Sequence, residues 1–329
     1  MTQAIRLGVS LFSYSSEYYL KRLSLDDALR KAKEAGGEAI EIVASQMMPG
    51  FPYPTKRWLH GLRARCEALE LEPFCYSAHL DSGLRSDRFL TDEEKVMSTV
   101  NDIRNAYEMG ASVVRTQHAI SPELLCRVAP WAEKYQVKVG VEIHPPHRFD
   151  TEIWQRFLKA FRDLDTPYIG VVVDTGIYQE YPYDGWLDAY AQHGVRRETI
   201  DALLELLAED AGLQTARDYL RAHDDSAYAG ELAEELFALY RPYRPDELAE
   251  VMKYVTHFHT KFYHMQDGEE KTIPYARLLE VIERSGFAGY LISEYEGHYC
   301  YDADQYPAAE QVREHIRMEK RLLAGNREE

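Results

Sequence analysis

Ionisable and apolar side chains alternate in the segment VTHFHTKFY, which ends at Tyr263. A strand turns successive side chains to opposite faces, so His257, His259 and Lys261 share one face. The two phenylalanines of the segment occupy the other face, where we expect them to pack against helices and to fix the register. Two imidazoles and an ammonium group on one face can bind a metal ion, transfer protons or pair with carboxylates. The segment therefore predicts chemistry on one side of a strand.

Three other strand-like segments place acidic side chains at their C-terminal ends. The segment KVGVEIH directs Glu142 and His144 to one face, and GVVVD ends with Asp174. The segment YLISEYE directs Glu294 and Glu296 to one face in the same way. If parallel strands bring these ends together, the carboxylates meet at one edge of the sheet. Uncompensated carboxylates in such a place repel one another, and a cation relieves the repulsion.

A divalent metal site follows from these side chains. Three carboxylates and one imidazole are mostly oxygen donors, which suit Mn²⁺, Mg²⁺ or Co²⁺ better than a soft metal. We expect Mn²⁺ first, held by Glu142, Asp174, His259 and Glu294. A register shifted by two residues would instead bring Glu296 or His257 into the site.

Other side chains of these strands have the chemistry of proton transfer or substrate binding. The imidazole of His144 can accept or donate a proton, and Lys261 can act as an acid or stabilise an enolate. An ion pair from Lys261 to Glu294 or Glu296 explains its position equally well. His257 is expected to orient a metal ligand or to pack lower in the sheet. Side chains at further strand ends are candidates for binding sugar hydroxyls: Tyr263, Arg115, Gln117, His79 and Glu296.

Strand-like and helix-like segments alternate along the whole chain. Eight strand-like segments stand out, which are LGVSLFSY, EAIEIVAS, PFCYSAHL, SVVRTQH, KVGVEIH, IGVVVDTG, VTHFHTKFY and GYLISEYE. Helix-capping residues support the alternation, namely Ser24, Thr91 with Glu94, and Ser121 before Pro122. The pattern predicts one (β/α)8 TIM-barrel domain over residues 1–329, with its site at the C-terminal ends of the strands.

Residues 177–245, between the sixth and seventh strand-like segments, interrupt this alternation. They are too long for a plain connection and contain helix-like tracts such as ETIDALLELLAED and GELAEELFALY. We expect a helical insertion that forms a lid over the C-terminal face of the barrel. Inserted helices that only add stability are the alternative.

The charge of the chain excludes some partners. Its 329 residues include 38 Lys and Arg against 55 Asp and Glu, a formal net charge of -17. Nucleic acid and anionic lipid surfaces repel such a chain.

The four cysteines are scattered without a CxxC pair, which favours reduced thiols. Because a basic leader and a long apolar run are both missing from the sequence, we expect a cytoplasmic protein.

The order of the candidate ligands resembles a known family. A Glu, an Asp, the His of an HxH segment and a Glu on four successive strands are similar to the pattern of the xylose isomerase-like TIM barrels. That superfamily includes sugar isomerases, ketose 3-epimerases and AP endonucleases. The resemblance spans nearly the whole chain except the insertion, and it implies that the metal ligands are Glu142, Asp174, His259 and Glu294. The net charge of -17 argues against an AP endonuclease.

Within that superfamily, several short motifs resemble the catalytic α subunits of C-glycoside deglycosidases. They are HFHTKFYHM, SEYEGH and EIHPP, together with the long insertion. The resemblance implies action on 3-keto-C-glycosides with a divalent metal and a small β subunit, and a homo-oligomer is the alternative assembly. Ketose 3-epimerases usually follow the seventh-strand His with Gly-Glu and an Arg, whereas Thr260 and Lys261 follow it here. That difference argues against a plain epimerase.

These inferences agree on an enzyme that removes a proton next to a sugar carbonyl, with a metal stabilising the enediolate. The favoured hypothesis is a C-glycoside deglycosidase that cleaves by β-elimination, with His144 as base and Lys261 assisting. The alternative is an aldose–ketose isomerase or ketose 3-epimerase, with Glu142 and Glu294 as the acid/base pair. A non-catalytic sugar-binding barrel is the third hypothesis. In a deglycosidase, aromatic side chains of the insertion would offer the aglycone a flat surface: Tyr178, Tyr181, Tyr183 and Trp186.

Overall fold

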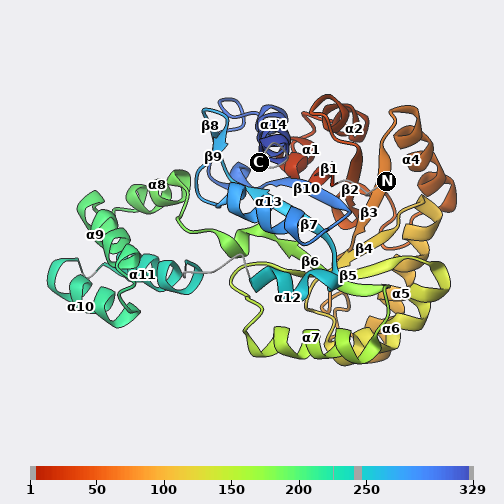
Figure 1. The fold of residues 1–329 in the computed structure, drawn as a ribbon, viewed down its shortest axis with the longest axis horizontal. Helices are drawn as coiled ribbons and strands as arrows, with labels where there is room; N and C mark the ends of the chain where they lie inside the picture. Colours follow the sequence, from red (N-terminus) through yellow and green to blue (C-terminus); the bar gives the residue numbers. More distant parts are fainter. Residues whose placement is uncertain (1–4, 225, 241–246, 326–329) are drawn as a thin grey trace.

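Eight parallel strands close into a barrel at the centre of the molecule (Figure 1). The computed structural model describes residues 5–224, 226–240 and 247–325. The last barrel strand pairs with the first, which closes the sheet. The strands follow chain order around the barrel: β1 Arg6–Ser10, β2 Ala39–Val43, β3 Glu72–Ser77, β4 Val113–Thr116, β5 Lys138–Ile143, β6 Ile169–Asp174, β7 Val255–Phe262 and β10 Tyr290–Tyr295. The predicted (β/α)8 TIM-barrel fold is therefore confirmed.

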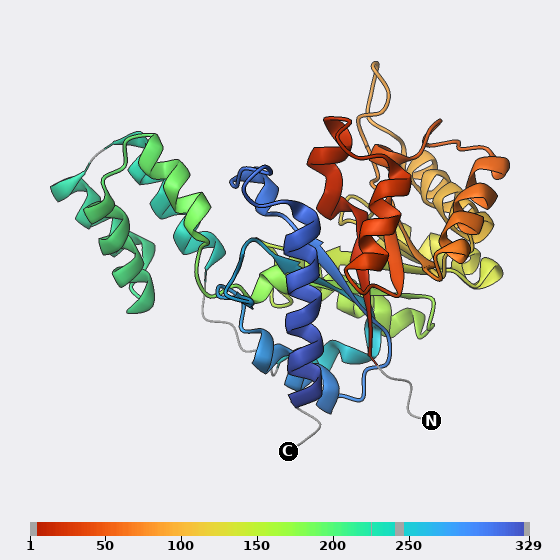
Figure 2. The same cartoon turned by 90° about the horizontal axis from the view of Figure 1, so that it is seen from above.

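Helices surround the barrel (Figure 2). Side-chain caps define where several of them begin. Thr91 and Glu94 form a capping box, and Ser121 accepts a hydrogen bond from the backbone N–H of Leu124. These caps and the one at Ser24 confirm the predicted helix starts. The helices outside the barrel are α2 Leu25–Glu34, α4 Lys56–Ala68, α5 Asp92–Met109, α6 Pro122–Tyr135, α7 Glu152–Leu164, α12 Leu248–Val251, α13 Tyr275–Arg284 and α14 Ala308–Gly325.

Short helical segments line the rim where β1, β2 and β10 end. They are η1 Leu11–Tyr14, α1 Ser15–Tyr19, α3 Ala44–Met47 and η5 Gly297–Tyr299. A two-stranded hairpin, β8 Met265–Gln266 with β9 Glu269–Glu270, follows β7. These segments belong to the βα connections, which carry the sites of TIM barrels.

Strand β7 has two different faces, and its phenylalanines point toward the surrounding helices. Phe258 meets Phe287 edge to face, with ring centroids 5.1 Å apart. Phe262 stacks on His315 of α14, with ring centroids 4.1 Å apart. Because side chains alternate along a strand, the histidines and the lysine of β7 face the inside of the barrel, as predicted.

Between η2 Thr175–Tyr178, which follows β6, and the short helix α12, the described residues form four helices: α8 Asp184–Gln192, α9 Arg197–Ala208, α10 Leu213–His223 and α11 Ala227–Leu239. They share a hydrophobic core of their own, which includes Leu203, Leu220, Leu232 and Leu236. Figures 1 and 2 show this helical group on one side of the barrel. The predicted end of the insertion at 245 lies outside the described residues, and its role as a lid stays a prediction.

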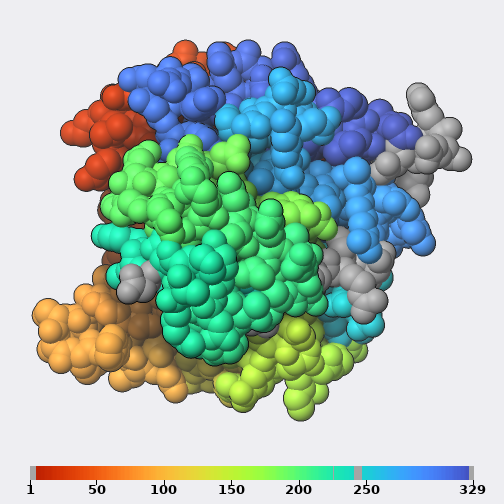
Figure 3. Space-filling model, turned by 90° about the vertical axis from the view of Figure 1, so that its left-hand side faces the viewer, coloured from red at the N-terminus to blue at the C-terminus, as the bar shows by residue number. Residues whose placement is uncertain are grey.

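Contacts at the base of the insertion hold it against the barrel. The Tyr183 ring stacks on Tyr263, with centroids 4.3 Å apart and an interplanar angle of 8°. The backbone N–H of Gly185 donates to the Tyr301 hydroxyl at 2.9 Å. When the molecule is viewed from the side of the insertion, the inserted helices lie in front of the barrel (Figure 3). The insertion therefore combines a separate core with a defined attachment at the rim.

The state of the cysteines agrees with the prediction of reduced thiols. All four cysteines are free, and Cys66 and Cys75 are buried. Among the described helices, none combines the length and the hydropathy that a bilayer-spanning segment requires.

The packing of Phe258 predicts how much it stabilises the fold. Phe258 is fully buried, so Phe258→Ala should lower the free energy of unfolding by about 3–5 kcal/mol through lost contacts and a cavity. Phe258→Leu should lower it less, because leucine fills most of the space. Phe89, which is 78% exposed, provides the control variant Phe89→Ala. Urea denaturation followed by circular dichroism measures all three, and equal stabilities of Phe258→Ala and Phe89→Ala would contradict the packing.

Candidate metal centre and acid–base site

The four predicted metal ligands meet inside the C-terminal end of the barrel. Oxygen atoms of Glu142, Asp174 and Glu294 lie within 4.8 Å of one another. Nδ1 of His259 lies 2.7 Å from Glu142 Oε1 and 3.2 Å from Glu294 Oε2. All four residues are buried, with exposures of at most 3%. The strands β5, β6, β7 and β10 thus bring these side chains together, and their role as ligands stays a prediction.

Glu41 of β2 is a further buried carboxylate, and it contacts both inward-facing histidines. Its Oε2 lies 2.9 Å from Nε2 of His259 and 3.2 Å from Nε2 of His257. Burial alone would raise the pKa of Glu41, but His259 and His257 lower it well below its usual range. The sequence motifs do not single out Glu41, although an acid between Ile40 and Ile42 in a strand indicates a buried charge.

The hydrogen bond to Glu41 determines the tautomer of His259. An ionised carboxylate only accepts, so Nε2 of the imidazole carries a proton and Nδ1 faces Glu142 and Glu294. Although these oxygens are close, Nδ1 makes no hydrogen bond of acceptable geometry among the described residues. A lone pair that faces two carboxylates is repelled unless a proton or a metal cation lies between them. The residues therefore fit a divalent cation, with Glu41 as the carboxylate behind its histidine.

The carboxylates around His259 also change its protonation. Burial alone would lower the pKa of His259, but Glu294, Glu41 and Glu142 raise it well above its usual value. The ring therefore holds a second proton when no cation is bound. A proton and a metal ion thus compete for the same nitrogen.

Lys261 bridges three carboxylates beside the candidate ligands. Its Nζ lies 2.6 Å from Glu296 Oε1, 2.8 Å from Glu294 Oε2 and 3.2 Å from Asp174 Oδ2. Burial alone would lower the pKa of Lys261, but Asp174, Glu294 and Glu296 raise it well above its usual value. The ion-pair alternative is thus present with both predicted glutamates. A catalytic role for Lys261 stays a prediction.

Arg115, Gln117 and His79 form a polar series that ends at Glu142. Arg115 Nη2 lies 2.7 Å from Glu142 Oε2, and Gln117 Nε2 donates to the same oxygen at 3.3 Å. Oε1 of Gln117 then accepts from His79 Nδ1 at 3.0 Å. With Glu296, the three residues line a cavity of about 330 Å³. They hold Glu142 in place, and their predicted binding of sugar hydroxyls remains to be tested.

His144 follows β5 and offers a basic nitrogen to the site. Its Nδ1 donates to the carbonyl oxygen of Pro145 at 2.7 Å, because a carbonyl only accepts. In the neutral ring Nε2 therefore carries the lone pair that a general base requires. His144 lines a cavity of about 300 Å³ together with Glu142, Lys261 and Tyr263. The predicted base, lysine and carboxylate thus share one space.

Two further histidines, which no sequence motif singles out, pack beside His144. The ring centroid of His118 lies 4.7 Å from that of His147 and 6.0 Å from that of His144. Burial lowers the pKa of both His118 and His147, so both rings are neutral near pH 7. They add an aromatic wall beside the base without adding charge.

The chain belongs to the xylose isomerase-like TIM barrel family, whose sequence profile matches residues 29–322. A solved structure of similar fold is the D-psicose 3-epimerase of Clostridium cellulolyticum H10. The two are 13% identical with a TM-score of 0.57, and the alignment covers 98% of this chain and 99% of that chain. At this identity the likeness concerns the fold.

Two relatives are similar over nearly their full length. The chain is 30% identical over 317 residues to the 3'-dehydrocarminate deglycosidase alpha subunit of a Microbacterium species, covering 91% of this chain and 90% of the relative. It is 26% identical over 326 residues to a C-glycoside deglycosidase alpha subunit of Arthrobacter globiformis, covering 97% and 92%. The similarity therefore extends well beyond the short motifs at the strand ends.

The hydrogen bond from His259 to Glu41 predicts an effect on metal binding. Glu41→Gln should weaken Mn²⁺ affinity by about 10- to 100-fold, because the amide no longer holds the histidine tautomer. Isothermal titration of metal-free protein measures the change. Glu319 is equally buried but lies in α14, outside the barrel, so Glu319→Gln should keep the affinity. Unchanged affinity in Glu41→Gln would contradict the orienting role.

Proposed function

We propose that the chain is the catalytic subunit of a C-glycoside deglycosidase, which cleaves the carbon–carbon bond between a 3-keto sugar and its aglycone. The observation that carries the proposal is the hydrogen bond from Nδ1 of His144 to Pro145, which leaves the lone pair on Nε2, in a side chain that shares a cavity with Lys261 and Glu142. The 30% identity to a deglycosidase alpha subunit over 91% of the chain supports the same reaction.

The reaction begins with His144 as general base. Its Nε2 removes the proton from C2 of the sugar, the carbon next to the C3 ketone, and the ketone stabilises the charge as an enolate. The electron pair then forms a C1=C2 double bond while the bond from C1 to the aglycone breaks. The electrons of that bond go to the aglycone carbon, which takes up a proton from protonated His144 or from Lys261. An unsaturated keto sugar and the free aglycone result, so the step consumes no oxidant and no water.

The candidate ligands would place a divalent cation beside this chemistry. Glu142, Asp174, His259 and Glu294 would hold it, and we infer Mn²⁺, with Mg²⁺ or Co²⁺ as substitutes, from their oxygen-rich donors. When bound, the cation supplies Lewis acidity that lowers the pKa of the C–H bond beside the ketone. The side chain of Lys261 adds positive charge next to the same carboxylates, at 2.8 Å from Glu294.

The hydrogen-bond partners of the two glutamates favour ligation over proton transfer. Glu142 is paired with Arg115 at 2.7 Å. Glu294 accepts from the Ser10 hydroxyl at 3.1 Å and pairs with Lys261 at 2.8 Å. Carboxylates with such partners are stabilised as anions, which suits a metal ligand and hinders an acid/base pair. The isomerase or epimerase alternative, which uses these glutamates to move the proton, therefore has less support.

We also infer that the chain works with a second subunit, because both relatives carry the name alpha subunit. A small β subunit is the partner that the resemblance implies. The four free thiols fit a reducing compartment such as the cytoplasm.

Incubation of the chain with Mn²⁺ and a 3-keto-C-glycoside tests the reaction, alone and with a co-expressed partner subunit. Liquid chromatography should detect released aglycone only when metal is present. Deuterium entry from solvent into a free keto sugar, without release of any aglycone, would identify an isomerase or epimerase instead. Metal binding with neither reaction would identify a sugar-binding barrel.

Replacement of His144 tests its role as base. His144→Ala should lower kcat for aglycone release by about 100- to 10,000-fold, which is the usual contribution of a general base. Mn²⁺ affinity should stay unchanged, because His144 is not among the candidate ligands. His147→Ala removes a neighbouring ring 6.3 Å away and should keep most of the activity. Full activity in His144→Ala would overturn the assignment.

A further inference from the structure

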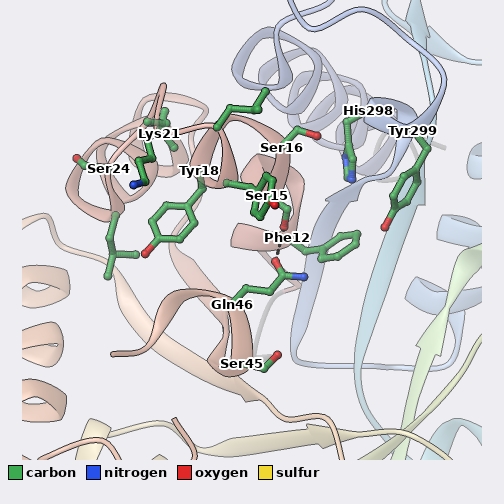
Figure 4. A pocket seen from close by; sticks show the side chains of 14 residues that line it. Phe12, Ser15, Ser16, Tyr18, Lys21, Ser24, Ser45, Gln46, His298 and Tyr299 are labelled. Carbon is green, nitrogen blue, oxygen red and sulfur yellow. Dashed lines mark hydrogen bonds between the residues drawn. The ribbon is translucent and has the colours of Figure 1, made fainter. Parts of the chain in front are cut away.

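A groove lies on the rim beside the ends of β1, β2 and β10. Its volume is about 1090 Å³, and its walls come from the segments η1, α1, α3 and η5. Figure 4 shows Phe12 and Tyr299 on one side of the groove and Tyr18 across from them, with Gln46 below. A planar ring system fits within this volume, which lies in the range of small-molecule sites.

The groove adjoins a second cavity, which in turn adjoins the acid–base site. Phe12, Ser45 and Gln46 line the groove and also line the adjoining cavity, which contains Arg115 and Glu294. That cavity in turn shares Arg115, Gln117 and Glu296 with the cavity around His144. The aglycone of a molecule with its sugar beside His144 would therefore lie toward the groove, on the side of this middle cavity.

Aromatic and apolar side chains of the groove face solvent. Tyr19 is 83% exposed, Tyr299 is 67% exposed and Leu20 is 56% exposed. The Phe12 ring lies 5.5 Å from His298 and 6.5 Å from Tyr299, centroid to centroid, so the rings form one wall. Large apolar groups that stay in water beside a reactive site are typical of a ligand surface.

Polar groups at the base of the groove add hydrogen-bonding capacity. The Ser15 hydroxyl donates to Gln46 Oε1 at 2.7 Å. This contact turns the amide nitrogen of Gln46 toward Phe12, as Figure 4 shows. An N–H group beside an aromatic wall suits a ring that carries hydroxyl or carbonyl oxygens.

The aromatic residues of the insertion offer a smaller surface. Tyr178 is 2% exposed, whereas Tyr181 is 54% exposed. Tyr183 already stacks on Tyr263. Trp186 packs edge to face on Tyr190. The cavity that Tyr183 and Trp186 line has a volume of about 180 Å³, well below that of the groove.

We propose that the groove between η1, α1 and η5 binds the planar aromatic aglycone of the substrate while the sugar lies beside His144. This inference rests on the proposed function, since it assigns the second half of the same substrate. Phe12 and Tyr299 are the specificity-determining residues, because they form the aromatic wall. The position of the groove next to the cavities of the acid–base site favours a small ligand over a protein partner that docks on the same surface.

Binding of a free aglycone tests the groove without any turnover. The flavone apigenin should bind the chain with Mn²⁺ present, and Phe12→Ala or Tyr299→Ala should raise its Kd by about tenfold or more. Tyr299 is largely exposed, so its variant keeps the test valid if Phe12→Ala fails to fold. Tyr107→Ala, at a 55% exposed tyrosine of α5, is the control and should bind normally. Weaker binding in Trp186→Ala with normal binding in both groove variants would overturn the proposal.

Turnover separates this inference from the function on which it rests. With a 3-keto-C-glycoside as substrate, the KM of the Tyr299→Ala variant should increase by at least the same factor as its Kd for apigenin. Its deuterium exchange with a free keto sugar, which has no aglycone, should match the unmodified chain. If the unmodified chain releases aglycone and Tyr299→Ala has the same KM, the groove proposal fails and the function stands. If nothing is released but apigenin binding still depends on Tyr299, the function fails and the groove remains an aromatic site.

Discussion

The site depends on a concentration of buried negative charge that needs a cation. Glu41, Glu142, Asp174 and Glu294 are all at least 97% buried, and each comes from a different strand. Without positive charge nearby, Coulombic repulsion among these four carboxylates would work against closure of the barrel. Arg115, Lys261 and protonated His259 supply positive charge in the chain itself. A divalent ion would take over part of this task, so folding and metal binding are thermodynamically linked.

Hydrogen bonds hold the two histidines of the candidate site in different tautomers. Glu41 fixes the proton of His259 on Nε2 and directs Nδ1 to the carboxylates. The carbonyl of Pro145 fixes the proton of His144 on Nδ1 and leaves Nε2 as the basic atom. The acceptor behind each ring thus orients one imidazole for the proposed role of ligand and the other for the proposed role of base. The acceptors are as important to the chemistry as the histidines.

The periodicity of the sequence predicted the fold and the cluster of candidate ligands for a physical reason. In a parallel barrel the strand ends meet, so alternate residues such as Glu142 and His259 can be placed in one space from the sequence alone. The contact of Glu41 with the histidines was not predicted in this way, because its partners lie on a strand more than 200 residues away in the sequence. The aromatic wall of the groove was not predicted either, since Phe12 and Tyr299 lie in short 3-10 segments without a sequence periodicity. Which tyrosines of the insertion stack on the barrel also depends on tertiary packing.

The separate core of the insertion has a consequence for how the enzyme can diversify. The inserted helices pack around Leu203, Leu232 and their neighbours, apart from the barrel core that contains Phe258. Substitutions on these helices therefore act on a packing unit that contributes none of the four candidate ligands. The stack of Tyr183 on Tyr263 connects this unit to the residues around Lys261, and the bond from Gly185 to Tyr301 connects it to the rim. Natural variation can rebuild the insertion while the strands of the candidate site keep their geometry, provided that these contacts at its base are retained.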